Sequence, residues 1–101
     1  MINLFKNLFG EKADLGELIR NGAIIVDVRT KDEFQRGHVR NSINIPLDKL
    51  AGNLKKLRND KPIITCCESG ARSAAAKNIL KSNGFDSVYN GGPWRSLANK
   101  R

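Results

Sequence analysis

The sequence predicts an α/β fold with a parallel sheet, and two patterns support this. Continuous apolar runs at Ala23–Val28 (AIIVDV) and Pro62–Cys66 (PIITC) are typical of strands that are buried on both faces. Apolar residues at helical spacing separate such runs, and this alternation favours strands joined by helices. A chain of 101 residues has room for one domain with its own core. We therefore expect a single domain over 1–101, with a core at about 13–100 and an N-terminal extension at 1–12.

Capping signals predict where the helices begin. Asp14 caps a helix over 14–20, with Glu17 as its capping-box partner. Thr30 and Glu33 form a second capping box and open a short helix that Gly37 ends. The spacing of apolar residues predicts further helices over 46–58, 73–82 and 94–100. Strands are expected at 23–28, 42–45, 62–66 and around 88–89, with the Gly-Gly-Pro sequence at 91–93 breaking the last one.

The composition limits the classes of partner. The net charge of +8, from 18 basic and 10 acidic residues, favours anionic partners. The basic residues are scattered without interleaved aromatic residues, which favours a solvated basic surface over a nucleic-acid site. The sequence has neither a run of ~20 apolar residues nor a signal-peptide core, so we expect no membrane partner and a cytoplasmic protein. The adjacent Cys66 and Cys67 fit free thiols in a reducing compartment.

The loop after the strand at 62–66 carries the chemistry. Cys67 stands at the base of this loop, and a helix is expected to begin near Ser73 with its free N–H groups directed toward the sulfur. Gly70 supplies the backbone freedom that an anion-binding nest of amides requires, and Arg72 adds positive charge. Each of these features favours a thiolate, so the sequence predicts a Cys67 of lowered pKa that acts as a nucleophile. The alternative, a small buried apolar side chain, leaves Gly70 and Arg72 unexplained.

These residues belong to a wider resemblance. From Ile24 to Leu97 the chain resembles the single-domain rhodanese-like sulfurtransferase family, and five motifs follow one another at the family's ordinary spacing. The motifs are Ile25-Val26-Asp27-Val28-Arg29, then Glu33-Phe34 with Gly37-His38-Val39, then Ser42-Ile43-Asn44-Ile45-Pro46, then the loop from Cys67 to Ser73, and last Asn90-Gly91-Gly92-Pro93-Trp94. One departure is Asn41-Ser42, where the family usually has Gly-Ala.

The resemblance implies a sheet of about five mostly parallel strands with helices on both faces. It also implies that Cys67 takes a sulfane sulfur from thiosulfate or another persulfide donor as a persulfide, and passes it to a thiol or cyanide. The implied partners are these small molecules or a sulfur-relay protein, with no cofactor and no metal. The loop residues implied to bind the substrate are Glu68, Ser69, Gly70, Ala71, Arg72 and Ser73.

Several interpretations of single residues stay open at this point. Glu68 beside the nucleophile opposes thiosulfate, which predicts a persulfide or a partner protein as the better donor. Arg29 and Glu33 are expected to form a salt bridge at the rim of the sheet. His38 is expected to cap a turn, in preference to pairing with Cys67, and Trp94 to fill core.

Two other functions compete with sulfur transfer. Cys66 and Arg72 satisfy the C-x5-R spacing of cysteine phosphatases, in which Cys66 would be the nucleophile and the loop would cradle phosphate. If Cys67 is the nucleophile, as we favour, then Cys66 is the last buried residue of the strand and is either inert or a resolving thiol. The domain also fits a non-catalytic persulfide carrier or binding module.

Overall fold

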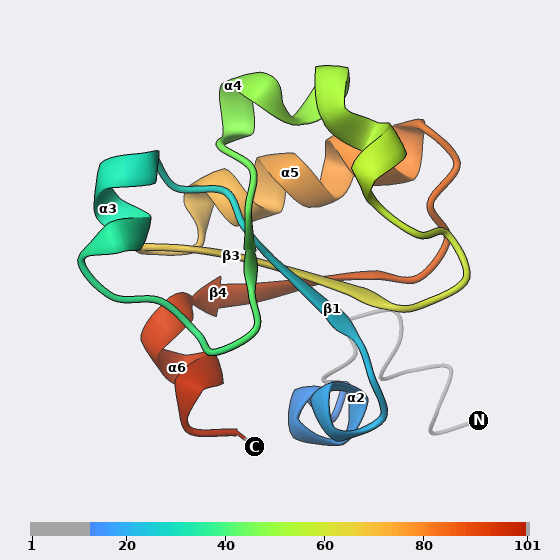
Figure 1. The fold of residues 1–101 in the computed structure, drawn as a ribbon. Helices are drawn as coiled ribbons and strands as arrows, with labels where there is room; N and C mark the ends of the chain where they lie inside the picture. The colour runs from blue at the N-terminus through green and yellow to red at the C-terminus, as the bar shows by residue number, and fades with distance from the viewer. Residues whose placement is uncertain (1–12, 101) are drawn as a thin grey trace.

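The computed structural model describes residues 13–100 and contains a four-stranded parallel sheet in the order β2-β1-β3-β4 (Figure 1). The strands are β1 (Ile24–Asp27), β2 (Ile43–Asn44), β3 (Ile63–Cys67) and β4 (Val88–Pro93). The α/β class and the parallel sheet are confirmed, with four strands in the described residues where the resemblance implies about five. The expected N-terminal extension at 1–12 lies outside the described residues.

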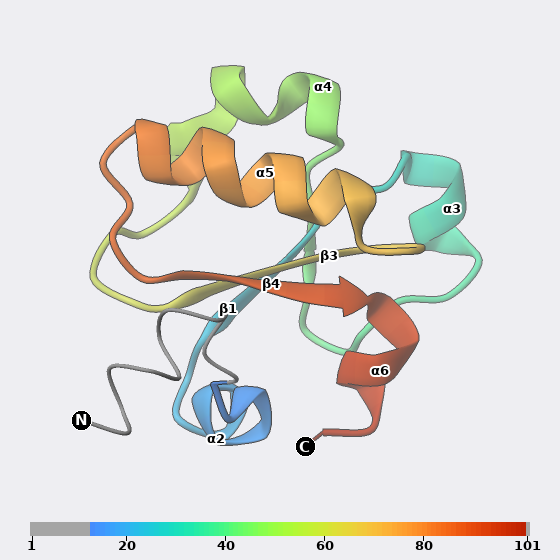
Figure 2. The ribbon, with the colours of Figure 1, turned by 180° about the vertical axis from the view of Figure 1, so that it is seen from behind.

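Helices cover both faces of the sheet, as expected (Figures 1 and 2). One face carries α4 (Leu47–Leu50), the 3₁₀ helix η1 (Ala51–Lys56) and α5 (Ala71–Ser82). The other face carries α2 (Leu15–Arg20) and α6 (Trp94–Ala98), while α3 (Lys31–Gln35) lies beyond the carboxyl ends of β1 and β3. Among the helices of residues 13–100, none has the length and apolar character needed to cross a membrane.

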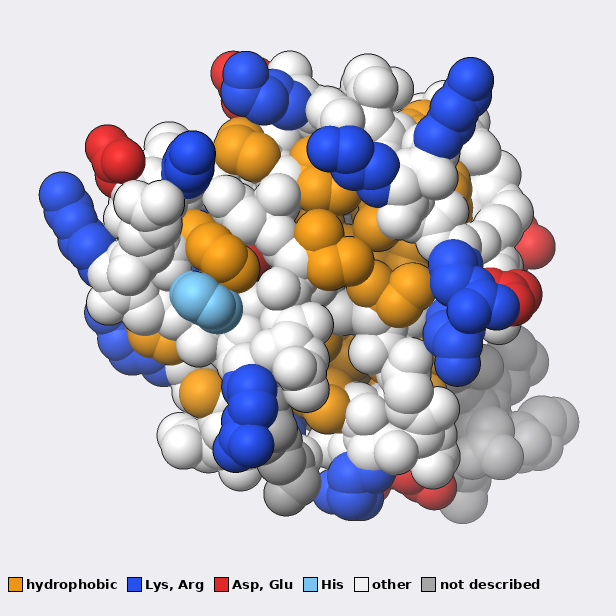
Figure 3. Space-filling model, in the orientation of Figure 1, with side chains coloured by type: hydrophobic (Ala, Val, Ile, Leu, Met, Phe, Trp, Pro, Cys, Tyr) orange, Lys and Arg blue, Asp and Glu red, His pale blue; other side chains and the backbone are white. Residues whose placement is uncertain are grey.

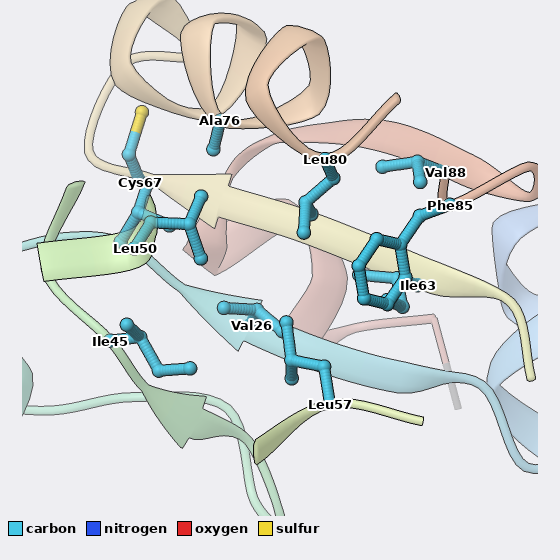
Figure 4. Close-up of a cluster of buried hydrophobic side chains, with 11 residues drawn as sticks. Val26, Ile45, Leu50, Leu57, Ile63, Cys67, Ala76, Leu80, Phe85 and Val88 are labelled. Atoms are coloured by element: carbon cyan, nitrogen blue, oxygen red, sulfur yellow. The ribbon is translucent and has the colours of Figure 1, made fainter. Parts of the chain in front are cut away.

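The sheet separates two apolar clusters because successive strand residues point to opposite faces. The cluster under α5 includes Val26, Ile63 and Cys67 (Figure 4). The cluster on the other face includes Ile64 and Cys66. The two adjacent cysteines therefore belong to different halves of the core.

The capping predictions hold with one exception. Thr30 and Glu33 form a complete capping box, in which the Glu33 amide donates to Thr30 Oγ1 and the Thr30 amide donates to Glu33 Oε1. Asp14 accepts a hydrogen bond from the Glu17 amide and caps α2. The reciprocal bond expected from the Glu17 side chain is absent among the described residues, so this prediction was wrong. Both caps satisfy backbone amides that the first helical turn leaves without a partner.

Three element boundaries differ from the predictions. The helix expected over 46–58 breaks at Asn53 (φ −127°), whose side chain donates to the Lys49 carbonyl and competes with the helical hydrogen bonds. β3 continues to Cys67, one residue further than expected. α5 begins at Ala71 in place of Ser73, because Gly70 at φ 111° makes the turn from loop to helix within one residue.

The last strand also differs from the prediction. β4 runs through Gly91 and Gly92 to Pro93, whereas the glycines were expected to break it. A Cβ atom on Gly91 would lie 2.7 Å from Ile64 Cγ2 and 2.8 Å from Leu97 Cδ1. Glycine at this position serves close packing within a strand and does not end it.

Candidate functional site

The sulfur of Cys67 lies at the end of β3, inside the turn that leads into α5. The Gly70 amide donates to Sγ at 3.0 Å and the Ser73 amide at 3.3 Å, while the Ser73 hydroxyl oxygen lies 3.5 Å from Sγ. The left-handed backbone of Gly70 turns its amide toward the sulfur. Cys67 is fully buried, and its side chain points toward the first turn of α5 (Figure 4). The predicted nest of amides is therefore present.

Two opposing effects act on the pKa of Cys67. Burial raises this pKa, because a thiolate is poorly solvated inside the fold. The hydrogen-bond contact with the Ser73 hydroxyl lowers it, as do the amides of Ser73, Gly70 and Ser69, which donate to the sulfur. The donors outweigh burial, and the net pKa lies below the ordinary value for a cysteine. Three of the six residues predicted to bind the substrate thus stabilise the charge of the nucleophile.

A residue of β4 for which the sequence predicted no separate role completes this network. Asn90 Oδ1 lies 2.6 Å from the Ser73 hydroxyl and also accepts a hydrogen bond from the Gly92 amide at 2.9 Å. Asn90 thereby holds the hydroxyl that faces Cys67. The Asn-Gly-Gly sequence carries a signal for this arrangement, because an asparagine side chain commonly bonds the backbone amide two residues on.

Cys66 has the opposite environment. Its side chain packs in the cluster on the far face of the sheet and is fully buried. Burial, followed by the nearby carboxylate of Asp27, raises the pKa of Cys66 to about 12. A C-x5-R phosphatase loop that uses Cys66 as nucleophile does not fit this geometry, because the loop amides donate to Cys67.

Arg72 is paired with Glu33 and does not face the sulfur as a free cation. Arg72 Nη1 lies 2.7 Å from Glu33 Oε1, and Nη2 lies 3.0 Å from Oε2. The hydrogen bonds from Arg72, together with the Thr30 amide, lower the pKa of Glu33 to about 2. This pair joins α3 to the first turn of α5 across 39 residues of sequence.

The salt bridge expected between Arg29 and Glu33 was wrong. Arg29 is buried and forms its salt bridge with Asp27 at 2.7 Å, because Asp27 is equally buried and two residues away. The same guanidinium donates to the backbone carbonyls of Gly37 (2.8 Å) and Glu33 (3.3 Å). It also lies over the Trp94 ring, 4.7 Å from the centroid. Arg29 therefore fixes α3 to the carboxyl end of β1.

Glu68 is turned toward α6. Its carboxylate lies 2.7 Å from Arg95 Nη1 and 3.7 Å from Arg29 Nη1, and accepts a hydrogen bond from the Trp94 indole at 3.3 Å. These partners, Arg95 first, lower the pKa of the Glu68 carboxyl. Trp94 packs against the far cluster, as predicted, and its ring also borders the loop. The negative charge of Glu68 is compensated, so it opposes anions less than the sequence indicated.

His38 takes no part in the sulfur site. As predicted, it caps a turn: Nδ1 donates to the Phe34 carbonyl at 2.7 Å, and the imidazole stacks on the Phe34 ring with centroids 3.7 Å apart. Among residues 13–100, no cluster of three or more His, Cys, Asp or Glu side chains offers a metal site.

A strand-end cysteine held by loop amides beneath a helix fits the rhodanese class that the five motifs indicate. The Rhodanese-like domain family model matches residues 11–92, and the chain belongs to this family. Among curated relatives, the thiosulfate sulfurtransferase GlpE of Pseudomonas savastanoi pv. phaseolicola is 34% identical over 85 residues, which cover 84% of this chain and 78% of GlpE. The uncharacterized protein YqhL of Bacillus subtilis is 38% identical over 68 residues, 67% of this chain. The chain spans about half of YqhL, since the match covers 54% of its length.

Solved structures agree with this assignment. The reduced CoADR-RHD of Bacillus anthracis superimposes with a TM-score of 0.75 and 32% identity, over 86% of this chain and 15% of that protein. An Escherichia coli rhodanese solved with anions gives a TM-score of 0.71 and 29% identity, over 76% of this chain and 93% of that one.

Proposed function

We propose that this protein is a sulfurtransferase that carries sulfane sulfur as a persulfide on Cys67. The observation that carries the proposal is the set of amide donors from Gly70 and Ser73 at 3.0 and 3.3 Å from Sγ. These donors stabilise a thiolate, and a thiolate is the form that attacks sulfur. They also suit a persulfide, because its outer sulfur is anionic at neutral pH.

The proposed reaction is a double displacement without net oxidation. The Cys67 thiolate attacks the outer sulfur of the donor, the sulfur–sulfur bond of the donor breaks, and its electron pair leaves with sulfite (from thiosulfate) or with a thiolate (from an organic persulfide). An acceptor thiolate or cyanide then attacks the outer sulfur on Cys67, and the electron pair of that bond returns to Sγ. Because Cys67 is fully buried, the groups around Sγ must open before either attack.

The charges at the loop support an organic persulfide as a better donor than thiosulfate. Arg72 is paired with Glu33, and Arg95 is paired with Glu68. An inorganic dianion therefore meets compensated charges where a free guanidinium would attract it. The unbridged cysteines support a reducing compartment such as the cytoplasm.

Intact-mass measurement of the full chain tests the proposal. We expect wild type to gain one sulfur atom after treatment with thiosulfate or an organic persulfide, and Cys67→Ser to gain none. Steady-state kinetics with a donor and an acceptor then distinguish an enzyme from a carrier, because an enzyme turns over many times with double-displacement patterns, whereas a carrier loads once. A protein that gains no sulfur from any donor, or gains it equally in Cys67→Ser, would contradict the proposal.

A further inference from the structure

A hollow of about 580 Å³ lies between α3, β2 and the start of α4. Its wall includes the stacked rings of Phe34 and His38, together with Pro46. On the face drawn in Figure 3, the pale-blue histidine lies against a hydrophobic side chain, and lysine or arginine side chains lie above and below the pair. The volume falls within the range of about 300–1,000 Å³ that is typical of small-molecule sites.

The charged groups of this hollow are all positive. Lys31 of α3 and Lys49 of α4 line it, and neither ammonium forms an ion pair with any residue from 13 to 100. Among the described residues that line the hollow, none carries a carboxylate. A concave surface of one sign concentrates ligands of the opposite sign. The hollow therefore favours a ligand with an apolar body and a negative charge.

The hollow shares Pro46 with a second one that extends toward the loop of Cys67. This smaller hollow has a volume of about 330 Å³, and Val28 and Leu47 border it together with one carboxylate, Asp48, and one guanidinium, Arg72. Val28 packs in the same apolar cluster as Cys67, and Arg72 belongs to the loop that holds the sulfur. A ligand that extends from the larger hollow through the smaller one thus reaches Val28 and Arg72, a core neighbour and a loop neighbour of Cys67.

The two regions differ in the charge that they offer to a substrate. At the loop, the guanidinium groups of Arg72 and Arg95 are paired with carboxylates. At the hollow, the ammonium groups of Lys31 and Lys49 have no carboxylate partner among the described residues. An anionic substrate therefore finds more attraction for its charged end at the hollow than at the loop.

We propose that the hollow binds the organic group of a small anionic thiol. This inference rests on the proposed sulfur transfer and names the substrate class. The thiolate of this molecule attacks the outer sulfur of the Cys67 persulfide, the sulfur–sulfur bond breaks, and its electron pair returns to Cys67 Sγ. The molecule leaves as its own persulfide, and the reverse reaction loads Cys67. No oxidant or reductant is consumed.

Matched acceptors test this site. The ω-mercapto acids with three, six and eleven carbons are compared with the mercapto alcohols of equal length, which carry the same primary thiol without the charge. The variant Lys31→Gln/Lys49→Gln is compared with Lys56→Gln/Lys81→Gln, which removes the same charge at exposed positions away from the hollow. Each variant is first loaded with sulfur and checked by intact mass.

We expect the hollow variant to lose about fivefold in kcat/KM for the acid of at least one chain length, the size that two exposed charge contacts supply. The alcohols should be unaffected in both variants, and the control variant should lose no acid selectivity. The preference of wild type for acids over alcohols should fall as salt is added. Equal losses for acids and alcohols, or no loss at any length, overturn the site while the mass gain on Cys67 stands. A wild type that never gains sulfur overturns the proposed function itself.

Discussion

Cys66 and Cys67 are neighbours in sequence and differ in almost every physical property. Cys67 faces α5, where the amides of Gly70 and Ser73 donate to its sulfur and, together with the Ser73 hydroxyl, lower its pKa. Cys66 faces the cluster on the other side of the sheet, where burial raises its pKa to about 12. The reactivity of a thiol here follows from the face of the strand to which it points and from the N–H groups around it.

Substituting each cysteine separately gives the largest expected difference in the rate of sulfur transfer. Cys67→Ser should lower sulfur transfer by about 10⁴-fold or more, because the nucleophile is lost. Cys66→Ala should keep transfer within about twofold of wild type and lower the free energy of unfolding by about 1 kcal/mol, since it removes one buried sulfur. Steady-state transfer rates and urea unfolding measure both changes. Loss of transfer in Cys66→Ala, with the fold intact, would give Cys66 a role as a resolving thiol and break the contrast.

The packing of the Cys66 side can be tested at Gly91. Gly91→Ala places a methyl group within 2.8 Å of Ile64 and Leu97, which share the cluster of Cys66. We expect the free energy of unfolding to fall by about 2 kcal/mol, as overpacking of a tight core does. Gly52→Ala is the control, because a Cβ atom there meets nothing within 4 Å. Equal urea midpoints for the two variants would show that the cluster of Cys66 accommodates the methyl group without loss of stability.

Local signals in the sequence predicted the parts of the fold and site that depend on short-range chemistry. The Thr30–Glu33 capping box needs only four residues, and the cradle of Cys67 follows from a strand, a glycine and a helix in succession. The four strands lie where the apolar runs predict them, although β4 continues through two glycines that were expected to end it. Gly91 is required by packing against Ile64 and Leu97, which neighbouring sequence does not reveal.

The partners of the charged residues depend on the tertiary structure. Arg72 and Glu33 stand 39 residues apart and meet only once α3 is docked beside α5. Arg29 was expected to pair with Glu33 at the rim of the sheet, yet it is buried and paired with Asp27. For a charged side chain the sequence gives the sign of the charge, whereas its partner depends on which helix ends the sheet brings together.

Removing the Ser73 hydroxyl from the surroundings of Cys67 should give an intermediate effect. Ser73→Ala deletes the hydroxyl 3.5 Å from Sγ, so the pKa of Cys67 should rise and its alkylation by iodoacetamide at pH 7 should slow about tenfold, the equivalent of one pKa unit. The measurement is the pH profile of alkylation in a Cys66→Ala background, with Ser69→Ala as the control, because the exposed Ser69 contributes through its amide. Identical profiles for the two serine variants would show that the Ser73 hydroxyl does not affect the pKa of Cys67.

The two thiols should also affect stability with opposite signs as pH changes. The lowered pKa of Cys67 stabilises the fold above about pH 8.5, the ordinary value, and this contribution is lost as pH falls through the folded pKa. The raised pKa of Cys66 does the reverse: folding loses stability as pH rises from about 8.5 toward about 12. Comparing the free energies of unfolding of Cys66→Ala and Cys67→Ala over this alkaline range should therefore show the steeper decline in Cys67→Ala, which retains Cys66. Parallel curves would mean that the environments of the two sulfurs are alike.

The smallest expected effect concerns the charge beside Cys67. Glu33→Gln releases the Arg72 guanidinium from its partner and keeps a side chain suited to the capping box at Thr30. The kcat/KM for thiosulfate should rise about threefold, the size of one partly exposed ion pair, while that for an uncharged organic persulfide should stay the same. Asp32→Asn, an exposed change on the same helix, is the control for net charge. The stability that the Glu33–Arg72 pair gives the wild type should be present above the unfolded pKa of about 4.3 and lost as pH falls toward about 2. If thiosulfate gains nothing, or gains equally in Asp32→Asn, then the pairing of Arg72 does not set the choice of donor.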